Sequence, residues 1–257
     1  MGLKNRLLQT TMRLVRAEES QTRHLSLATK QLYLTYHPDS HSLFSAHPEF
    51  NRLLDKFTAH NRANNGGDIV RLWSFILNLK QVLGEGIEGH FAELGVWRGN
   101  TAAILAYYAR ENKRKVYLFD TYEGFSQEDL VGVDAGKTLE FSNTSLDMVK
   151  IVVGPEDDFC HYIRGRFPNS IRDTDKNQKF AVVSLDCDLY EPMRAGLEFF
   201  YPRMARGGIF FLHDYSSIHW EGAKKAIDEF CHENKEFIIL LPDKSGSAFL
   251  RKTKANS

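Results

Sequence analysis

Three acidic residues and a histidine directly follow two short apolar runs, residues 180–185 and 209–212. They are Asp186, Asp188, His213 and Asp214. Apolar runs this short, bounded by turn residues, are typical of buried parallel strands. Because ligands bind at the carboxyl ends of such strands, we expect these four side chains to meet at one edge of a sheet.

Carboxylates lie this close together only when a cation or a proton relieves their repulsion. Oxygen ligands with one imidazole nitrogen suit a hard divalent ion such as Mg²⁺. The residues therefore predict a divalent-cation site, and they leave open whether Asp188 and the nearby Glu191 bind the ion. Both acids could instead stabilise the start of the helix that follows them.

A glycine loop follows the first expected strand and opens a helix near Thr101. Gly95 and Gly99 allow a tight turn and a close approach of the backbone to a ligand. A dinucleotide-binding loop has three glycines, so the pattern favours a ligand with adenosine and no pyrophosphate. Glu93, at the end of the strand, would suit a cation such as an amino group, and we expect these four residues to contact a cofactor.

The second expected strand ends at Asp120. An acid at this position is placed to accept hydrogen bonds from ribose hydroxyls. The alternative is a purely structural aspartate that caps a turn or a helix.

Strands and helices alternate from His90 onward, which predicts βαβ units and a parallel sheet. Strands are expected at 90–94, 115–119, 160–164, 180–185, 209–212, 236–241 and 247–251, and helices at 100–111, 145–153, 190–202 and 220–233. The last two strands are joined by a segment too short for a crossover helix, so we expect them to form an antiparallel hairpin. The long segment 121–144 has little periodicity and is a candidate active-site loop.

Five motifs in this order resemble those of the macrocin O-methyltransferase family. They are Glu93-Leu-Gly95-Val-Trp-Arg98-Gly99, Phe119-Asp120-Thr-Tyr-Glu-Gly124-Phe125, Arg164-Gly165-Arg-Phe167-Pro168, Asp186-Cys-Asp188-Leu-Tyr190-Glu191 and His213-Asp214-Tyr215. The resemblance covers roughly Asp68 to Arg251. It implies a Rossmann-like class I methyltransferase with a seven-stranded, mostly parallel sheet, which uses S-adenosylmethionine and Mg²⁺ or another divalent cation to methylate sugar hydroxyls.

The resemblance also implies roles for individual cofactor residues. Glu93 and Gly95 would lie near the methionine part of S-adenosylmethionine, and Asp120 would bind its ribose. Gly165 and Phe167 would border the adenine.

The same resemblance assigns the cation ligands to Asp186, His213 and Asp214. The family often has Asp-Asp-Tyr where this chain has His213-Asp214-Tyr215, so the histidine is a departure from its pattern. His213 would bind the ion through nitrogen or act as a base beside it. Either Asp186 or His213 would take the proton of the acceptor hydroxyl.

Composition and charge restrict the class of protein. The chain has 257 residues with 33 basic and 33 acidic side chains, which argues against a nucleic-acid binder because such proteins carry a basic excess. Its three cysteines form no CxxC pair, as expected in a reduced cytoplasm. No apolar run approaches the ~20 residues of a membrane-spanning helix.

The N-terminal part has a different pattern, and we expect a helical extension over 1–67 and a methyltransferase domain over 68–257. Asp68 is placed to cap the first helix of that domain. Residues 3–16 form a basic amphipathic pattern that can lie on a membrane surface. We favour an arm that packs on its own core or on a second subunit, and we expect a homo-oligomer.

The sequence thus favours a Mg²⁺-dependent O-methyltransferase acting on a hydroxyl of a sugar or glycosylated product. An NAD-dependent sugar oxidoreductase is one alternative, opposed by the missing third loop glycine. A non-catalytic scaffold with the methyltransferase fold is another, motivated by His213 and by the N-terminal arm.

Overall fold

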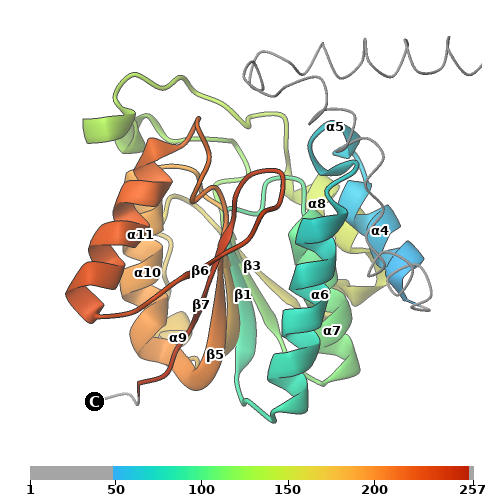
Figure 1. Cartoon of the computed structure of the whole chain (residues 1–257). Coiled ribbons are helices and arrows are strands. Elements are labelled where there is room, and N and C mark those ends of the chain that lie inside the picture. Colours follow the sequence, from blue (N-terminus) through green and yellow to red (C-terminus); the bar gives the residue numbers. More distant parts are fainter. Residues whose placement is uncertain (1–48, 255–257) are drawn as a thin grey trace, which may run out of the picture. The chain divides into compact units, whose positions relative to one another are not determined.

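The computed structural model describes residues 49–254, which form a seven-stranded sheet with helices on both faces (Figure 1). The strands are β1 (His90–Leu94), β2 (Val116–Asp120), β3 (Cys160–Arg164), β4 (Phe180–Leu185), β5 (Met204–Leu212), β6 (Ile239–Leu240) and β7 (Ala248–Arg251). Their spatial order is β3-β2-β1-β4-β5-β7-β6, and β7 runs antiparallel to both of its neighbours. The predicted mostly parallel sheet, closed by an antiparallel hairpin, is confirmed.

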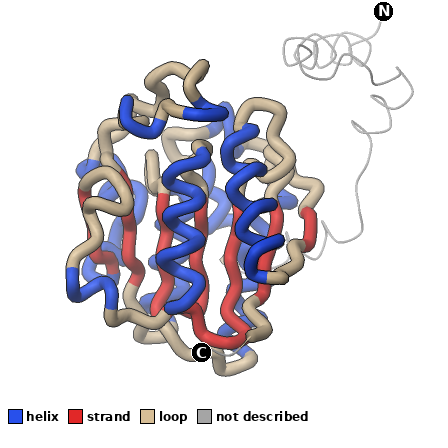
Figure 2. Tube along the Cα trace, turned by 90° about the vertical axis from the view of Figure 1, so that its left-hand side faces the viewer, coloured by secondary structure: helices blue, strands red, loops and turns tan. Residues whose placement is uncertain are grey.

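The helices form a layer on each face of the sheet. They are α4 (Phe50–Thr58), α5 (Arg62–Asn65), α6 (Ile69–Gly84), α7 (Asn100–Glu111), α8 (Leu146–Val153), α9 (Asp173–Lys176), α10 (Tyr190–Phe200) and α11 (Glu221–Asn234). Figure 1 shows α6 and α7 on one face and α10 and α11 on the other, and Figure 2 shows the strands in red behind the helices in blue. The sheet is therefore covered on both faces, as expected for parallel strands.

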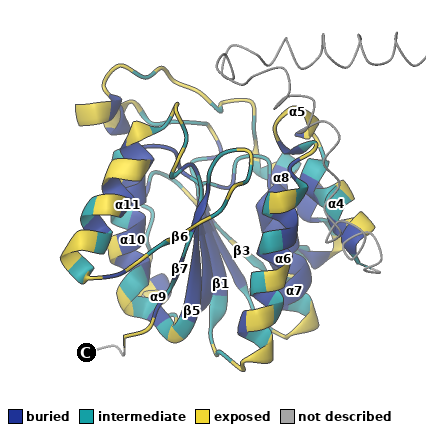
Figure 3. Cartoon of the chain, viewed as in Figure 1, coloured by how far each residue is buried: buried dark blue, intermediate teal, exposed yellow. Residues whose placement is uncertain are grey.

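Burial explains why the central strands read as continuous apolar runs. All six residues of β4 are buried, and Figure 3 shows the strands dark blue between the helix layers. Helix α7 is buried from Asn100 to Ala109 and carries four alanines on that stretch, which let it pack closely. Asp68 caps α6 as predicted, since its side chain accepts a hydrogen bond from the backbone N–H of Arg71.

Two strands differ in length from the prediction. Strand β5 begins at Met204 rather than 209, because Met204 pairs with Phe180 of β4. Backbone hydrogen bonds between Lys252 and the glycines at 207 and 208 continue the pairing through a segment that looks like a turn. Strand β6 contains only Ile239 and Leu240, and both side chains are exposed. A strand at the sheet edge with no buried face has little to hold it in register.

The start of the chain lies outside the described residues up to position 48, so the expected helix over 3–16 stays a prediction. Residues 49–67 belong to the same compact unit as the sheet. Helix α4 packs against α7, and the Nζ atom of Lys56 lies 3.0 Å from Glu156 Oε2. The domain boundary expected after residue 67 stays a prediction as well.

Segment 121–144 contains two short 3-10 turns, Gln127–Asp129 and Gly132–Asp134, and is otherwise irregular. Figure 1 shows it (green) at the end of the molecule where the parallel strands finish. Asp134 fixes it there, because its Oδ2 accepts a hydrogen bond of 2.7 Å from the backbone N–H of Tyr190 at the start of α10.

Among residues 49–254, no helix combines the length and the apolar character needed to cross a membrane.

Candidate active site

Backbone hydrogen bonds bring the residues after three strands side by side. The N–H of Asp186 donates to the carbonyl of Leu94, the last residue of β1, at 2.9 Å. The N–H of His213 donates to Leu185, the last residue of β4, also at 2.9 Å. Gly95, which follows β1, therefore lies directly beside Asp186, and Asp186 lies beside His213.

Gly95 is required by this close approach. A Cβ atom on this residue would lie 2.0 Å from the backbone oxygen of Asp186, and its φ is +84°. Neither the space nor the backbone conformation allows a side chain. The glycine loop and the acidic cluster thus share one packed edge, as the sequence predicts.

The predicted cation ligands come together. Ligand atoms of Asp186, His213 and Asp214 all lie within 4.8 Å of one another. Nδ1 of His213 lies 2.6 Å from Oδ1 of Asp186 and 2.5 Å from Oδ2 of Asp214. Its Nε2 is buried and has no partner in the described part of the chain. Two carboxylates and one imidazole are a suitable donor set for a divalent ion.

The charges in this cluster stabilise one another. Burial and Arg71 act to lower the pKa of His213, but Asp186 and Asp214 outweigh them and raise it to about 10. Burial acts to raise the pKa of Asp186, but His213 and Arg71 hold it well below its usual range. The ring is therefore protonated and Asp186 ionised at neutral pH in this arrangement.

Arg71 is a member of the site that the sequence did not reveal. Its Nη2 donates to Oδ2 of Asp186 at 2.6 Å and lies 3.5 Å from Oγ1 of Thr101. The residue stands in the first turn of α6, an amphipathic helix that also carries Ser74, Asn78, Lys80 and Gln81. An arginine at such a position resembles any solvent-facing residue, so no local signal distinguishes it.

Asp188 also lies beside the cluster. It is buried and has a φ of +61°. Burial, followed by the charges of Asp214 and Asp186, raises its pKa well above the usual value. The close group of ligand atoms among the described residues consists of Asp186, His213 and Asp214, so the geometry favours a supporting role for Asp188 next to Asp214.

Glu93 is a buried acid near the end of β1. It is 1% exposed, and Oε2 has no hydrogen-bond partner within the described residues. Burial and the nearby charge of Asp186 raise its pKa well above the usual value. An unsatisfied buried oxygen is unfavourable unless a ligand pairs with it.

Asp120 holds the glycine loop rather than standing free. Its Oδ2 accepts from the backbone N–H groups of Val96 at 2.6 Å and Trp97 at 2.9 Å, and its Oδ1 accepts from that of Tyr122 at 2.6 Å. A contact with a ribose would have to use the remaining lone pairs. Asp120 therefore has a structural role in these turns, which is the alternative to ribose binding that the sequence left open.

The other predicted cofactor residues have different environments. Gly99 precedes α7 with a φ of +82°, and Thr101 is buried in the first turn of that helix. The N–H of Gly165 donates to the carbonyl of Asp120 at 2.9 Å, which places it at the same edge. The ring of Phe167 packs in the core against Phe119 and other aromatic rings. The expected contact of Phe167 with an adenine stays a prediction.

Aromatic side chains connect segment 121–144 with the glycine loop. Phe125 and Phe141 belong to segment 121–144, and their ring centroids are 5.0 Å apart. Trp220 lies 5.6 Å from Phe125, and Trp97 of the glycine loop lies 5.2 Å from Phe141. Segment 121–144 is thereby packed against both the glycine loop and the chain that follows Asp214, where the sequence places a candidate active-site loop.

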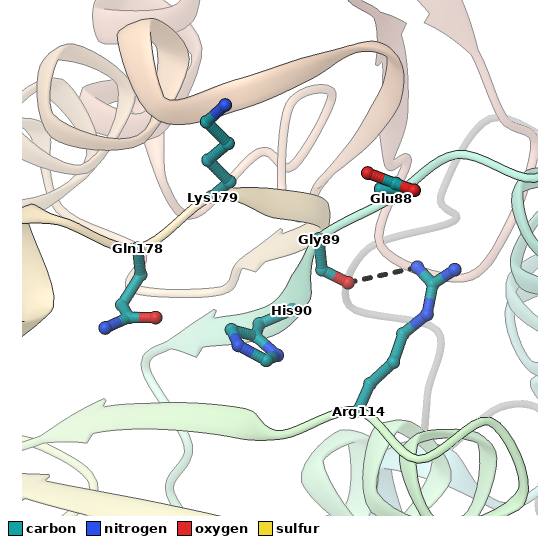
Figure 4. Close-up of a pocket in the computed structure, with 6 residues that line it drawn as sticks. All are labelled: Glu88, Gly89, His90, Arg114, Gln178 and Lys179. Atoms are coloured by element: carbon teal, nitrogen blue, oxygen red, sulfur yellow. Dashed lines mark hydrogen bonds between the residues drawn. The ribbon is translucent and has the colours of Figure 1, made fainter.

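A shallow pocket of about 280 Å³ lies at the opposite edge of the sheet (Figure 4). Its lining comes from Glu88, Gly89, His90, Arg114, Gln178 and Lys179. Figure 4 shows Arg114 donating to the carbonyl of Gly89, at 3.0 Å. These residues precede β1, β2 and β4 or begin β1, so the pocket is separate from the predicted site.

The fold is that of class I methyltransferases. The solved structure of the O-methyltransferase NovP is similar, with a TM-score of 0.63 and 20% identity over 84% of this chain and 94% of that one. The calicheamicin methyltransferase CalS11 gives a TM-score of 0.60 and 22% identity over 89% of this chain and 94% of that one.

Residues 4–240 match the macrocin-O-methyltransferase (TylF) family, and the chain belongs to this family of enzymes. The family resemblance predicted from the motifs is confirmed. Its expected start at Asp68 is wrong, because the match begins at residue 4. The family match thus includes the N-terminal part, although the five motifs all lie after it.

Characterised relatives are similar over about half of this chain. The 8-demethyl-8-(2,3-dimethoxy-alpha-L-rhamnosyl)-tetracenomycin-C 4'-O-methyltransferase of Streptomyces olivaceus is 29% identical over 54% of this chain and 57% of its own length. Mycinamicin III 3''-O-methyltransferase of Micromonospora griseorubida is 28% identical over 53% of this chain and 59% of its own. The chain thus spans less than two thirds of the length of these relatives.

Proposed function

We propose that this protein is an O-methyltransferase that moves a methyl group from S-adenosylmethionine to a hydroxyl of a sugar or glycosylated product, with the help of a divalent cation. Membership of the family supports the reaction class. The relatives named above are O-methyltransferases, one of them for a rhamnosyl-bearing compound. The main support is the packing of the Gly95 loop directly against Asp186 at one edge.

The residues around Gly95 fit S-adenosylmethionine. The unpartnered Oε2 of Glu93 would pair with the amino group of its methionine part. The glycines at 95 and 99 would allow this loop to approach the cofactor closely. Asp120 holds the loop by accepting hydrogen bonds from the backbone N–H groups of residues 96 and 97. Methyl transfer requires the acceptor oxygen in line with the methyl group, and such positioning supplies much of the rate.

Asp186, His213 and Asp214 fit a divalent cation such as Mg²⁺ by number and type of donor. When bound, such an ion lowers the pKa of a hydroxyl and fixes its direction. Asp186 or His213 would accept the proton. His213 is protonated at neutral pH with the present partners, so it can bind the ion through nitrogen or act as a base only after it has lost that proton.

The test combines binding with turnover. Isothermal titration of S-adenosylmethionine and S-adenosylhomocysteine, with Mg²⁺ and with EDTA, measures the cofactor. Methyl transfer to nucleotide sugars and glycosylated compounds then measures the reaction. We expect Asp214→Asn to lower the rate by at least about 100-fold, whereas Asp173→Asn, on an exposed side chain, should leave it unchanged.

The alternatives predict different results. Absence of S-adenosylmethionine binding under every condition would contradict the proposal, and binding of NAD(H) in its place would support a sugar oxidoreductase. Binding of cofactor and cation without turnover on a broad sugar panel would support a scaffold. Asp120→Ala is not a clean test of cofactor binding, because the change also removes the partners of the glycine loop.

A further inference from the structure

We propose that Arg71 is a positioning residue that orients the carboxylate of Asp186 and weakens the binding of the divalent cation at the same carboxylate. This inference rests on the proposed function, because it concerns the cation site made by Asp186, His213 and Asp214.

Both oxygens of Asp186 have a fixed partner. Oδ2 accepts from Nη2 of Arg71 at 2.6 Å, and Oδ1 lies 2.6 Å from Nδ1 of His213. A carboxylate held on both oxygens cannot rotate without breaking a charge-assisted hydrogen bond. Arg71 therefore helps to fix the orientation of the Asp186 carboxylate relative to the histidine ring.

Arg71 is itself built into the fold. Its backbone N–H donates to the capping side chain of Asp68, and its guanidinium lies 5.7 Å from the ring of Phe57. The same group reaches Thr101 on α7 at 3.5 Å, and the Arg71 side chain is only 13% exposed. Contacts with α4 and α7 hold the guanidinium in place, and the cap of α6 holds the backbone of the same residue.

The charge of Arg71 is permanent, because a guanidinium does not deprotonate in proteins. It lies in hydrogen-bond contact with a proposed ligand of a divalent cation. The guanidinium of Arg71 and a cation bound to the same carboxylate would repel each other, because both are positively charged. The same residue that prepares Asp186 thus opposes the ion, so its removal should tighten cation binding while it disorders the carboxylate.

Three substitutions separate the two effects. Arg71→Gln keeps an N–H donor without the charge, Arg71→Lys keeps the charge, and Arg71→Met keeps neither. The control is Arg206→Met, which removes an equal charge from an exposed position at the start of β5, at the opposite edge. Mn²⁺ is the probe, and its Kd is measured by calorimetry without acceptor.

We expect Arg71→Met and Arg71→Gln to lower the Kd of Mn²⁺ about tenfold, while Arg71→Lys and Arg206→Met stay within about twofold of wild type. At saturating Mn²⁺, kcat should fall most in Arg71→Met and less in Arg71→Gln. The Kd of S-adenosylhomocysteine in EDTA should stay unchanged in all four, and urea denaturation shows separately that each variant is folded.

The outcomes are distinguishable. Neutral variants that fold and bind Mn²⁺ no more tightly than wild type would overturn the role of Arg71. A loss of S-adenosylhomocysteine binding in folded Arg71→Gln would also overturn it, because Arg71 would then act on the cofactor. If neither wild type nor any variant binds Mn²⁺ at millimolar concentration, the cation dependence in the proposed function fails.

Discussion

His213 is paired with Asp186 through a single ring nitrogen, which lies 2.6 Å from Oδ1 of the aspartate. The pairing follows from the sheet, because the backbone of His213 hydrogen-bonds to the residue that precedes Asp186. The same nitrogen contacts Asp214 at 2.5 Å. A positively charged ring thus lies between the carboxylates of Asp186 and Asp214. A carboxylate at position 213 would instead repel both of them.

Replacement of His213 by aspartate should make the protein depend on a cation for stability. His213→Asp places three carboxylates together, so we expect the free energy of unfolding in EDTA to fall by about 1–3 kcal/mol relative to His213→Asn. Mn²⁺ should restore more stability to the aspartate variant, because a carboxylate is the better ligand for a hard ion. Urea denaturation with EDTA and with Mn²⁺ measures both effects. Equal responses of the two variants to Mn²⁺ would contradict this view of the site.

Glu93 should contribute to cofactor binding and little to the fold. Glu93→Gln replaces a buried acid of raised pKa by a neutral group of the same shape, so the free energy of unfolding should change by less than about 1 kcal/mol. The Kd for S-adenosylmethionine should rise about tenfold, since the amide cannot become negative opposite an amino group. Calorimetry measures the Kd, with Glu111→Gln on the surface as control. Unchanged affinity in Glu93→Gln would exclude Glu93 as the partner of the amino group.

Gly95 and Gly86 provide a matched pair of substitutions. Both have positive φ, but a Cβ at Gly86 meets no atom of residues 49–254 within 4 Å, whereas one at Gly95 meets the backbone of Asp186. Gly86→Ala should cost only the backbone strain, about 1–2 kcal/mol. Gly95→Ala should cost clearly more and abolish S-adenosylmethionine binding. Urea denaturation compares the two, and similar losses of stability would show that the loop can relax away from Asp186.

His90 should make stability depend on pH at the edge opposite the site. Its Nδ1 accepts a hydrogen bond of 3.2 Å from the backbone N–H of Lys115, which requires the neutral ring. Burial, followed by the charges of His161, Arg114 and Lys115, lowers its pKa. The unfolded chain therefore takes up the proton first as pH falls.

The stabilising contribution of His90 is thus complete above the unfolded pKa of about 6.5 and is lost as pH falls through the lower folded pKa. His90→Gln keeps an acceptor that does not titrate. We expect this variant to lose less stability than wild type between about pH 6.5 and 5, by roughly the 0.5–1.5 kcal/mol of one hydrogen bond. The check is urea denaturation across that range, and parallel curves for the two proteins would contradict the prediction.

The sequence by itself determined the order of strands and helices along the chain. It also determined that the site lies at the carboxyl ends of the parallel strands. Burial on both faces makes β4 apolar at every position, and the acid that ends such a run must emerge at its carboxyl end. The acids at 186 and 214 could be predicted because they follow buried strands. Gly95 could be predicted because two glycines four residues apart after a strand indicate a tight loop. These features depend on residues that are neighbours in the chain, whose patterns report local backbone geometry and burial.

The tertiary structure alone decided which groups complete the site. Arg71 reaches Asp186 only because α6 docks beside β4 and β5. Asp120 is occupied by backbone donors of a folded loop, and the ring of Phe167 lies in the core. No local pattern encodes these contacts, since each joins segments that are distant in the chain and that meet only when the helices pack onto the sheet.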